Sequence, residues 1–259
     1  MAGVWTTEIV AGHPCDIYLP PQVGRSQLEQ NAAPPHEARA VVIYLHGVHL
    51  NKLHDKQPFL AEFDRHGLAV VCPQTRRSWW TDKICGEFDS RFSAQQYLLD
   101  YILPFVAERL GAKPPQIALL GTSMGGQGAL RFAYKFPNQF PVVAAISPAI
   151  DYQSRYNEGD ETIPQMYPDP ESARQDTALL HVHPLNWPRH QFFCCDPEDY
   201  RWWESADRLR MKLYSLGVPH VCNLDTTGGG HGFDYYNRMA PQAIRFIADR
   251  LEQERRRAI

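Results

Sequence analysis

The pentapeptide at residues 121–125 (GTSMG) contains the residues best suited to chemistry in this chain. It matches G-x-S-x-G, a turn in which a serine stands between a strand and a helix with its hydroxyl exposed above the end of a sheet. The context fits, because an apolar run at 117–120 enters the turn and a helix-like stretch at 127–135 leaves it. We therefore predict that Ser123 is a nucleophile.

The two glycines of the pentapeptide have a steric reason. A serine in this turn is held in a strained backbone conformation. A side chain at Gly121 or Gly125 would collide with the turn or keep the helix from approaching the strand. Both positions therefore favour glycine.

A serine hydroxyl needs a base within hydrogen-bond reach. In this type of turn-based site the acid and then the histidine follow the serine along the chain. His231 lies in a glycine-rich loop, 228–232, after the last expected strand and before the last expected helix. We predict that His231 is the base, and that the other ten histidines are structural or at the surface.

The acid that orients the histidine should follow the penultimate strand, expected at 191–195. Asp196 and Asp199 both lie there, and Asp151 is a more distant alternative. We favour Asp199, because the chain needs a turn before it can direct a carboxylate toward His231. Asp196 is expected to cap the Asp-Pro bend with its side chain.

Acyl transfer also needs donors for a developing oxyanion. The backbone N–H of Met124, which follows the nucleophile, is the first candidate. The second should come from the loop after an earlier strand. His46-Gly47-Val48 fits that place, and we predict that the backbone N–H of Val48 is the second donor.

The rest of the chain predicts an α/β fold. Residues 6–19 alternate loosely and indicate an antiparallel pair, whereas near-continuous apolar runs separated by helical stretches indicate a parallel sheet covered on both faces. The buried runs are 40–45, 68–72, 117–120, 142–146, 191–195 and 220–224. We expect helices around 98–109, 206–216 and from near Pro241 onward, and a polar connection over 22–39.

One segment interrupts this alternation. Residues 151–189 are polar, proline-rich and weakly periodic, and they are too many for an ordinary connection between a strand and a helix. We predict one domain over residues 1–259 with a cap or lid insertion at 151–189.

The charge and composition of the chain limit the partners that it is expected to bind. The formal net charge is −3, with 26 basic and 29 acidic residues, which gives no reason to expect nucleic acid or an acidic membrane as a partner. No apolar run is long enough to span a membrane, and we see no signal peptide. The six cysteines lack the spacing of a disulfide framework or a zinc site, so we expect a reduced, cytoplasmic protein without a metal.

With these residues assembled, the chain resembles the α/β-hydrolases. More narrowly it is similar to the "putative esterase" family, which includes esterase D, S-formylglutathione hydrolase, feruloyl esterases and the mycolyl-transferring antigen proteins. The resemblance rests on 45–47 (LHG), 121–129 (GTSMGGQGA), Asp199 and 230–232 (GHG). Two features depart from it. Asp196 replaces the glycine of a Gly-x-x-Asp turn, and 48–50 (VHL) lacks the cysteine of S-formylglutathione hydrolases.

The resemblance implies hydrolysis of carboxylic esters or thioesters through an acyl-enzyme, with a small-molecule substrate and no cofactor. Trp79, Trp80 and Arg77 follow the strand at 68–72 and are candidate substrate-binding residues, the tryptophans as an apolar wall and the arginine for a carboxylate. Packing of the aromatic rings is the alternative. An acyltransferase, a serine peptidase or a catalytically silent binding protein on the same scaffold also remains open.

Overall fold

The computed structural model describes residues 3–21 and 40–257, so the connection expected over 22–39 lies outside the described residues. The described chain forms an eight-stranded sheet in the order β1-β2-β4-β3-β5-β6-β7-β8. Strands β3 to β8 are parallel, and β2 runs opposite to its two neighbours. The strands are β1 Val4–Val10, β2 His13–Leu19, β3 Val41–Leu45, β4 Ala69–Pro73, β5 Ile117–Thr122, β6 Val142–Ile146, β7 His190–Cys194 and β8 Val221–Asn223.

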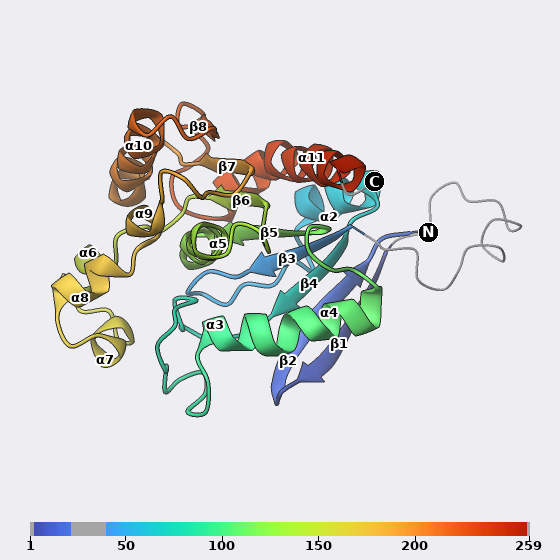
Figure 1. Cartoon of the computed structure of the whole chain (residues 1–259), viewed down its shortest axis with the longest axis horizontal. Coiled ribbons are helices and arrows are strands. Elements are labelled where there is room, and N and C mark those ends of the chain that lie inside the picture. The colour runs from blue at the N-terminus through green and yellow to red at the C-terminus, as the bar shows by residue number, and fades with distance from the viewer. Residues whose placement is uncertain (1–2, 22–39, 258–259) are drawn as a thin grey trace, which may run out of the picture.

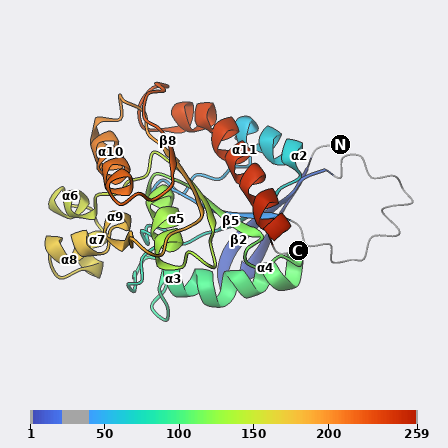
Figure 2. The same cartoon turned by 45° about the horizontal axis from the view of Figure 1, so that its top comes forward.

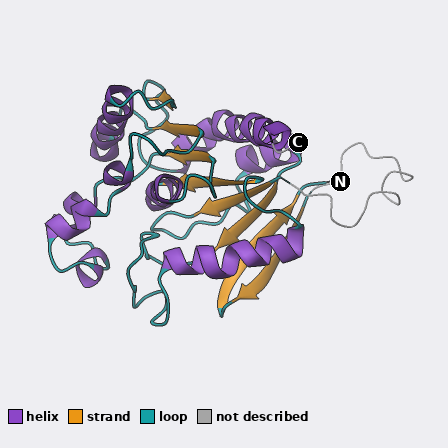
Figure 3. Ribbon diagram, viewed as in Figure 1, coloured by secondary structure: helices purple, strands orange, loops and turns teal. Residues whose placement is uncertain are grey.

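Helices cover both faces of this sheet, which confirms the predicted α/β-hydrolase class of fold (Figures 1 and 3). The main helices are α2 Gln57–His66, α3 Ala94–Gln96, a π-helical turn Tyr97–Ile102, α4 Leu103–Leu110, α5 Met124–Lys135, α10 Tyr200–Ser215 and α11 Phe233–Arg257. Helices α2 and α11 lie side by side on one face (Figure 2), and α3 to α5 with α10 pack on the other.

Successive side chains along each strand point to opposite faces of the sheet, and this produces two hydrophobic cores, one on each face. In β3, Val41, Ile43 and Leu45 join the core beneath α4 and α5, whereas Val42 and Tyr44 join the core beneath α2 and α11. Because successive strand residues point to opposite faces, a strand buried on both sides must be apolar throughout.

The apolar runs therefore predicted the strands to within about two residues at each end, the usual uncertainty of such boundaries. The last helix was placed wrongly. It begins at Phe233, directly after the loop of His231, and Pro241 lies inside it rather than at its start.

Four short helices lie between β6 and β7. They are α6 Tyr152–Asn157, α7 Ile163–Met166, α8 Pro170–Gln175 and α9 Ala178–His181. Helix α9 packs on α5, and α6 contacts α7 and α8 (Figure 1). No described helix has the combination of length and apolar composition needed to cross a bilayer.

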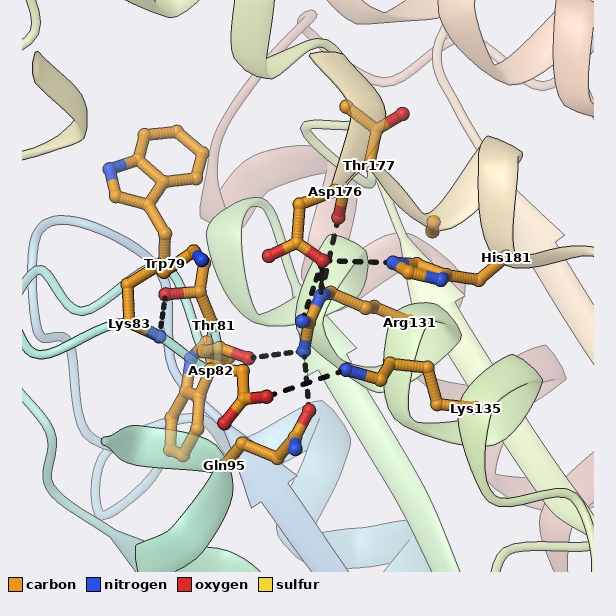
Figure 4. A network of polar contacts seen from close by, with 12 residues as sticks. Trp79, Thr81, Asp82, Lys83, Gln95, Arg131, Lys135, Asp176, Thr177 and His181 are labelled. Carbon is orange, nitrogen blue, oxygen red and sulfur yellow. Dashed lines mark hydrogen bonds and ion pairs between the residues drawn. The ribbon is translucent and has the colours of Figure 1, made fainter. Parts of the chain in front are cut away.

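A buried ion pair joins this insertion to α5 (Figure 4). Arg131 of α5 has no exposed surface, and its Nε and Nη2 donate to Oδ1 of Asp176 at 3.0 and 2.7 Å. Its Nη1 donates to Gln95 at 2.9 Å, while Asp176 also bonds to His181 and Tyr167. Burial alone would favour the neutral acid. The bond from His181 and the charge of Arg131 outweigh burial and hold the pKa of Asp176 below its usual value.

Replacing Arg131 should destabilise the fold strongly. Arg131→Met leaves the carboxylate of Asp176 without its cation, and losing one partner of a buried pair costs about 3 kcal/mol or more. Urea denaturation should show a lower midpoint than in the wild type. The control is Arg174→Met, which removes a solvent-exposed pair with Glu171 and should change the midpoint little. Equal midpoints for the two variants would contradict the anchoring role of Arg131.

Candidate active site

Ser123 occupies the strained turn that the sequence predicts. Ser123 lies between the end of β5 and the first turn of α5, and its backbone has a φ of 54° and a ψ of −120°. A Cβ on Gly125 would lie 1.8 Å from the carbonyl oxygen of Leu45, and one on Gly121 would lie 2.0 Å from the carbonyl oxygen of Gly125. The steric explanation of both glycines is thus confirmed.

Three predicted residues form one chain of hydrogen bonds. Nε2 of His231 lies 2.8 Å from Oγ of Ser123, and Nδ1 of His231 lies 2.6 Å from Oδ2 of Asp199. They come from the ends of β5 and β7 and the loop after β8, which meet at one edge of the sheet because these strands are parallel. The side chain of His231 is 30% exposed and that of Asp199 is 3% exposed, so the base is open to solvent above a buried acid.

The structure separates the three candidate acids. Asp199 is the N-cap residue of α10, yet its side chain makes no capping bond and is directed at His231 instead. Asp196 accepts from Glu198 N–H at 2.8 Å, as the expected cap of the bend. It also accepts from the N–H groups of Gly228 and Gly230 at 2.6 and 2.9 Å. Asp151 caps α6 and pairs with Arg208. Only Asp199 contacts the imidazole.

Asp196 therefore holds the loop that carries His231. Gly229 and Gly230 have φ of 91° and 75°, a conformation that favours glycine and leaves a loop with little intrinsic order. The buried carboxylate of Asp196 fixes two N–H groups of this loop to the end of β7. The imidazole is placed through these backbone bonds.

The two predicted oxyanion donors belong to segments that adjoin Ser123. Met124 is the first residue of α5, where N–H groups have no acceptor within the helix, and its N–H has no partner among the described residues. A Cβ on Gly47 would lie 3.3 Å from Cβ of Ser123, so the loop carrying Val48 is packed against the nucleophile. The positive end of the α5 dipole also lies at this point.

The side chain of His46 fixes the loop that carries Val48 through two hydrogen bonds to backbone groups. Its Nε2 accepts from Thr75 N–H at 3.1 Å, so Nδ1 carries the proton and donates to the carbonyl oxygen of Gly47 at 2.9 Å. Burial, opposed only by the bond to Gly47, lowers the pKa of His46 to about 4. The histidine is therefore neutral near pH 7 and acts as a structural cross-link.

The predicted substrate residues Trp79 and Trp80 must be corrected. They are 1% and 0% exposed, which leaves them no surface for a ligand in this structure. The indole N–H of Trp80 donates to the carbonyl oxygen of His46 at 3.1 Å, and its Cβ packs where α5 has Gly128. Tyr152 donates to the carbonyl oxygen of Trp79 at 2.8 Å. Both tryptophans therefore stabilise the loop that follows β4.

Arg77 is placed at a cleft but is already paired. A cleft of about 570 Å³ extends from Val48 and is lined by Val48, His49, Leu50, Arg76, Arg77 and Glu87. The guanidinium of Arg77 bonds to both Glu87 and Glu161, so it is not free for a substrate carboxylate. A second cleft, of about 590 Å³, is bordered by Ala40 and Gln116 at the amino ends of β3 and β5, at the opposite edge of the sheet from Ser123.

One residue beside the triad was not predicted. The hydroxyl of Tyr236 lies 2.9 Å from Nε2 of His231. From the sequence, Tyr235 and Tyr236 are expected to pack the last helix, because large aromatic side chains bury much surface. Nothing in the sequence distinguishes Tyr236 as a neighbour of the imidazole. Among residues 3–21 and 40–257, no group of three or more His, Cys, Asp or Glu residues is arranged to hold a metal ion.

A family model described as "Putative esterase" matches residues 14–216. The chain belongs to this family. It is therefore a serine hydrolase of the carboxylic ester hydrolase class, and the resemblance inferred from the motifs is confirmed.

Solved structures share the fold of this esterase. A ferulic acid esterase has a TM-score of 0.72 at 17% identity, covering 95% of this chain and 98% of its own. The S-formylglutathione hydrolase FrmB from Staphylococcus aureus has a TM-score of 0.72 at 18% identity, covering 95% and 98%. FphF, a fluorophosphonate-binding serine hydrolase of Staphylococcus aureus, has 0.71 at 17%, covering 96% and 99%. No curated protein matched the sequence.

The neutral His46 of this esterase predicts a pH dependence of stability. Unfolded histidine binds a proton near pH 6.5, but folded His46 binds one only near pH 4. Between these values the unfolded state binds more protons, so the free energy of unfolding should fall as the pH falls from about 6.5 to 4.

Urea denaturation at several pH values across this window checks the contribution of His46. His46→Gln removes the titrating group, and its stability should decline less steeply than that of the wild type. His49→Gln, at an exposed position in the same loop, controls for loss of a histidine. Parallel curves for wild type and His46→Gln would show that His46 does not titrate in this window.

Proposed function

We propose that this chain cleaves carboxylic esters, and thioesters, through an acyl-enzyme on Ser123, with His231 as base and Asp199 as acid. The proposal rests on one observation, the continuous hydrogen-bonded chain from Asp199 through His231 to Ser123. The strained backbone of Ser123 and the two N–H donors beside it add support.

In the first half-reaction, Oγ of Ser123 bonds to the acyl carbon while its proton passes to Nε2 of His231. Asp199 keeps the other imidazole proton on Nδ1 and stabilises the charged ring. The N–H groups of Met124 and Val48 would bind the oxyanion. The intermediate then collapses as Nε2 returns the proton to the leaving alcohol.

In the second half-reaction, water attacks the acyl carbon and gives a proton to Nε2. The bond from carbon to Oγ then breaks, Oγ takes the proton back, and the free acid leaves. No step requires a metal or an organic cofactor.

The cleft beside Val48 is the proposed binding site for the rest of the substrate. The insertion at 151–189 is joined to the edge of this cleft, because Glu161 bonds to Arg77. The proposed substrate is a small-molecule ester. The six cysteines are free, which is consistent with the proposed cytoplasmic location.

A series of p-nitrophenyl esters from acetate to octanoate should reveal the activity and the size of the acyl site. Removing the nucleophile or the base in a serine hydrolase costs about 10⁶ in kcat, so Ser123→Ala and His231→Ala should be inactive within detection. Loss of labelling by a fluorophosphonate probe in Ser123→Ala provides the matching control. Full ester hydrolysis by Ser123→Ala would rule out the proposed nucleophile. Adding alcohol or amine acceptors would reveal any acyl transfer.

The choice between the two carboxylates can be tested separately. Asp199→Asn retains the shape of the acid but loses the charge that holds the imidazole, and kcat should fall by about 10⁴. Asp196→Asn weakens only the backbone bonds of the His231 loop, so it should retain substantially more activity. Kinetics at one pH, with folding checked by circular dichroism, distinguish them. The reverse order would identify Asp196 as the more important carboxylate.

A further inference from the structure

Tyr236 presents a hydroxyl to the reacting nitrogen of the triad. The phenol oxygen lies 2.9 Å from Nε2 of His231. Its ring stands perpendicular to the imidazole, with centroids 5.6 Å apart, and packs edge-on against Phe233. The residue is 5% exposed, so packing holds the hydroxyl in this position.

Nε2 therefore has two hydroxyl neighbours, because Oγ of Ser123 lies 2.8 Å away. With Nδ1 donating to Asp199, the neutral imidazole has a single lone pair at Nε2. Ser123 and Tyr236 cannot both donate to it in good geometry. Packing alone would not require a polar atom at this position, since phenylalanine has the same ring.

The phenol is suited to donate and unsuited to act as a base. Burial, followed by the nearby charge of Asp199, raises the pKa of Tyr236 well above its usual value. It therefore keeps its proton throughout the pH range in which an esterase works.

We propose that Tyr236 is a positioning residue, whose hydroxyl donates a hydrogen bond to Nε2 of His231 while Ser123 carries the acyl group. The inference rests on the acyl-enzyme of the proposed function. Once Oγ is bonded to the acyl carbon it has no proton to donate, and Nε2 loses that partner. Tyr236 then supplies a donor that holds the imidazole until water arrives.

The phenol is not consumed. Water displaces the Tyr236 bond, its oxygen forms a bond to the acyl carbon, and its proton passes to Nε2. As the bond from carbon to Oγ breaks, Nε2 returns that proton to Oγ. The proton of Tyr236 stays on its oxygen, so the step balances without another reactant.

This role predicts an effect on one half-reaction. During acylation Ser123 itself holds Nε2, whereas during deacylation only Tyr236 does so before water binds. Tyr236→Phe keeps the ring and removes the donor. Water must break the Tyr236 bond before it can reach Nε2, so losing this one hydrogen bond should speed deacylation by about 3- to 10-fold.

The two half-reactions can be measured with p-nitrophenyl acetate. Release of p-nitrophenol reports acylation, and intact mass after rapid removal of the reagent reports loss of the acetyl group from Ser123. We expect Tyr236→Phe to acylate within about twofold of the wild-type rate but to deacylate about 3- to 10-fold faster. Where deacylation limits turnover, kcat and KM should rise together and leave kcat/KM nearly unchanged.

Tyr235→Phe is the matched control. Tyr235 is the preceding, fully buried residue of α11, and its hydroxyl has no hydrogen-bond partner within the described residues. It should match the wild type in both half-reactions. Deacylation by Tyr236→Phe at or below the wild-type rate would overturn the inference, and so would an equal change in both half-reactions. A wild-type enzyme that forms no acetyl-Ser123 would instead overturn the proposed function and this inference with it.

Discussion

The close approach of α5 to the end of β3 sets the geometry on which the rest of the site depends. Gly125 lies so near the carbonyl oxygen of Leu45 that a Cβ there would be 1.8 Å from it. This contact brings the nucleophile turn against the loop at 46–48, which follows β3. The two proposed oxyanion donors, Met124 and Val48, come from these two segments. A helix displaced by the width of a methyl group would separate them, and catalytic geometry tolerates little displacement.

The loops at this edge are ordered by buried polar side chains rather than by their own sequence. Asp196 accepts three backbone N–H groups, two of them from the glycine-rich loop of His231. His46 joins Thr75 to Gly47 beneath the other loop. Each uses its hydrogen-bonding capacity on backbone groups that would otherwise be buried without partners. Reactive side chains placed on loops thus obtain the rigidity of the sheet.

The sequence predicted those features whose physical cause lies in neighbouring residues of the chain. Apolar runs predict buried strands, and the serine turn and the glycine-flanked His231 carry their steric requirements in neighbouring residues. Trp79 and Trp80 gave no such signal, because the residue type does not reveal whether the ring packs inward or lines a cleft. Trp80 donates to the carbonyl oxygen of His46, 34 residues away, and the ring of Trp79 packs edge-on against Tyr152. The Arg131–Asp176 pair and the contact of Tyr236 with His231 likewise depend on tertiary structure, and no sequence pattern reveals them.

The insertion at 151–189 is tied to the rest of the enzyme at two places within its length. Glu161 bonds to Arg77 at the cleft, and Thr162 donates to the carbonyl oxygen of Arg77 at 3.0 Å. Asp176 pairs with Arg131, which has no exposed surface. Moving the insertion as one body would break a buried ion pair, and leaving a charge buried without its partner costs several kcal/mol. Displacement of the whole segment away from α5 is therefore energetically costly.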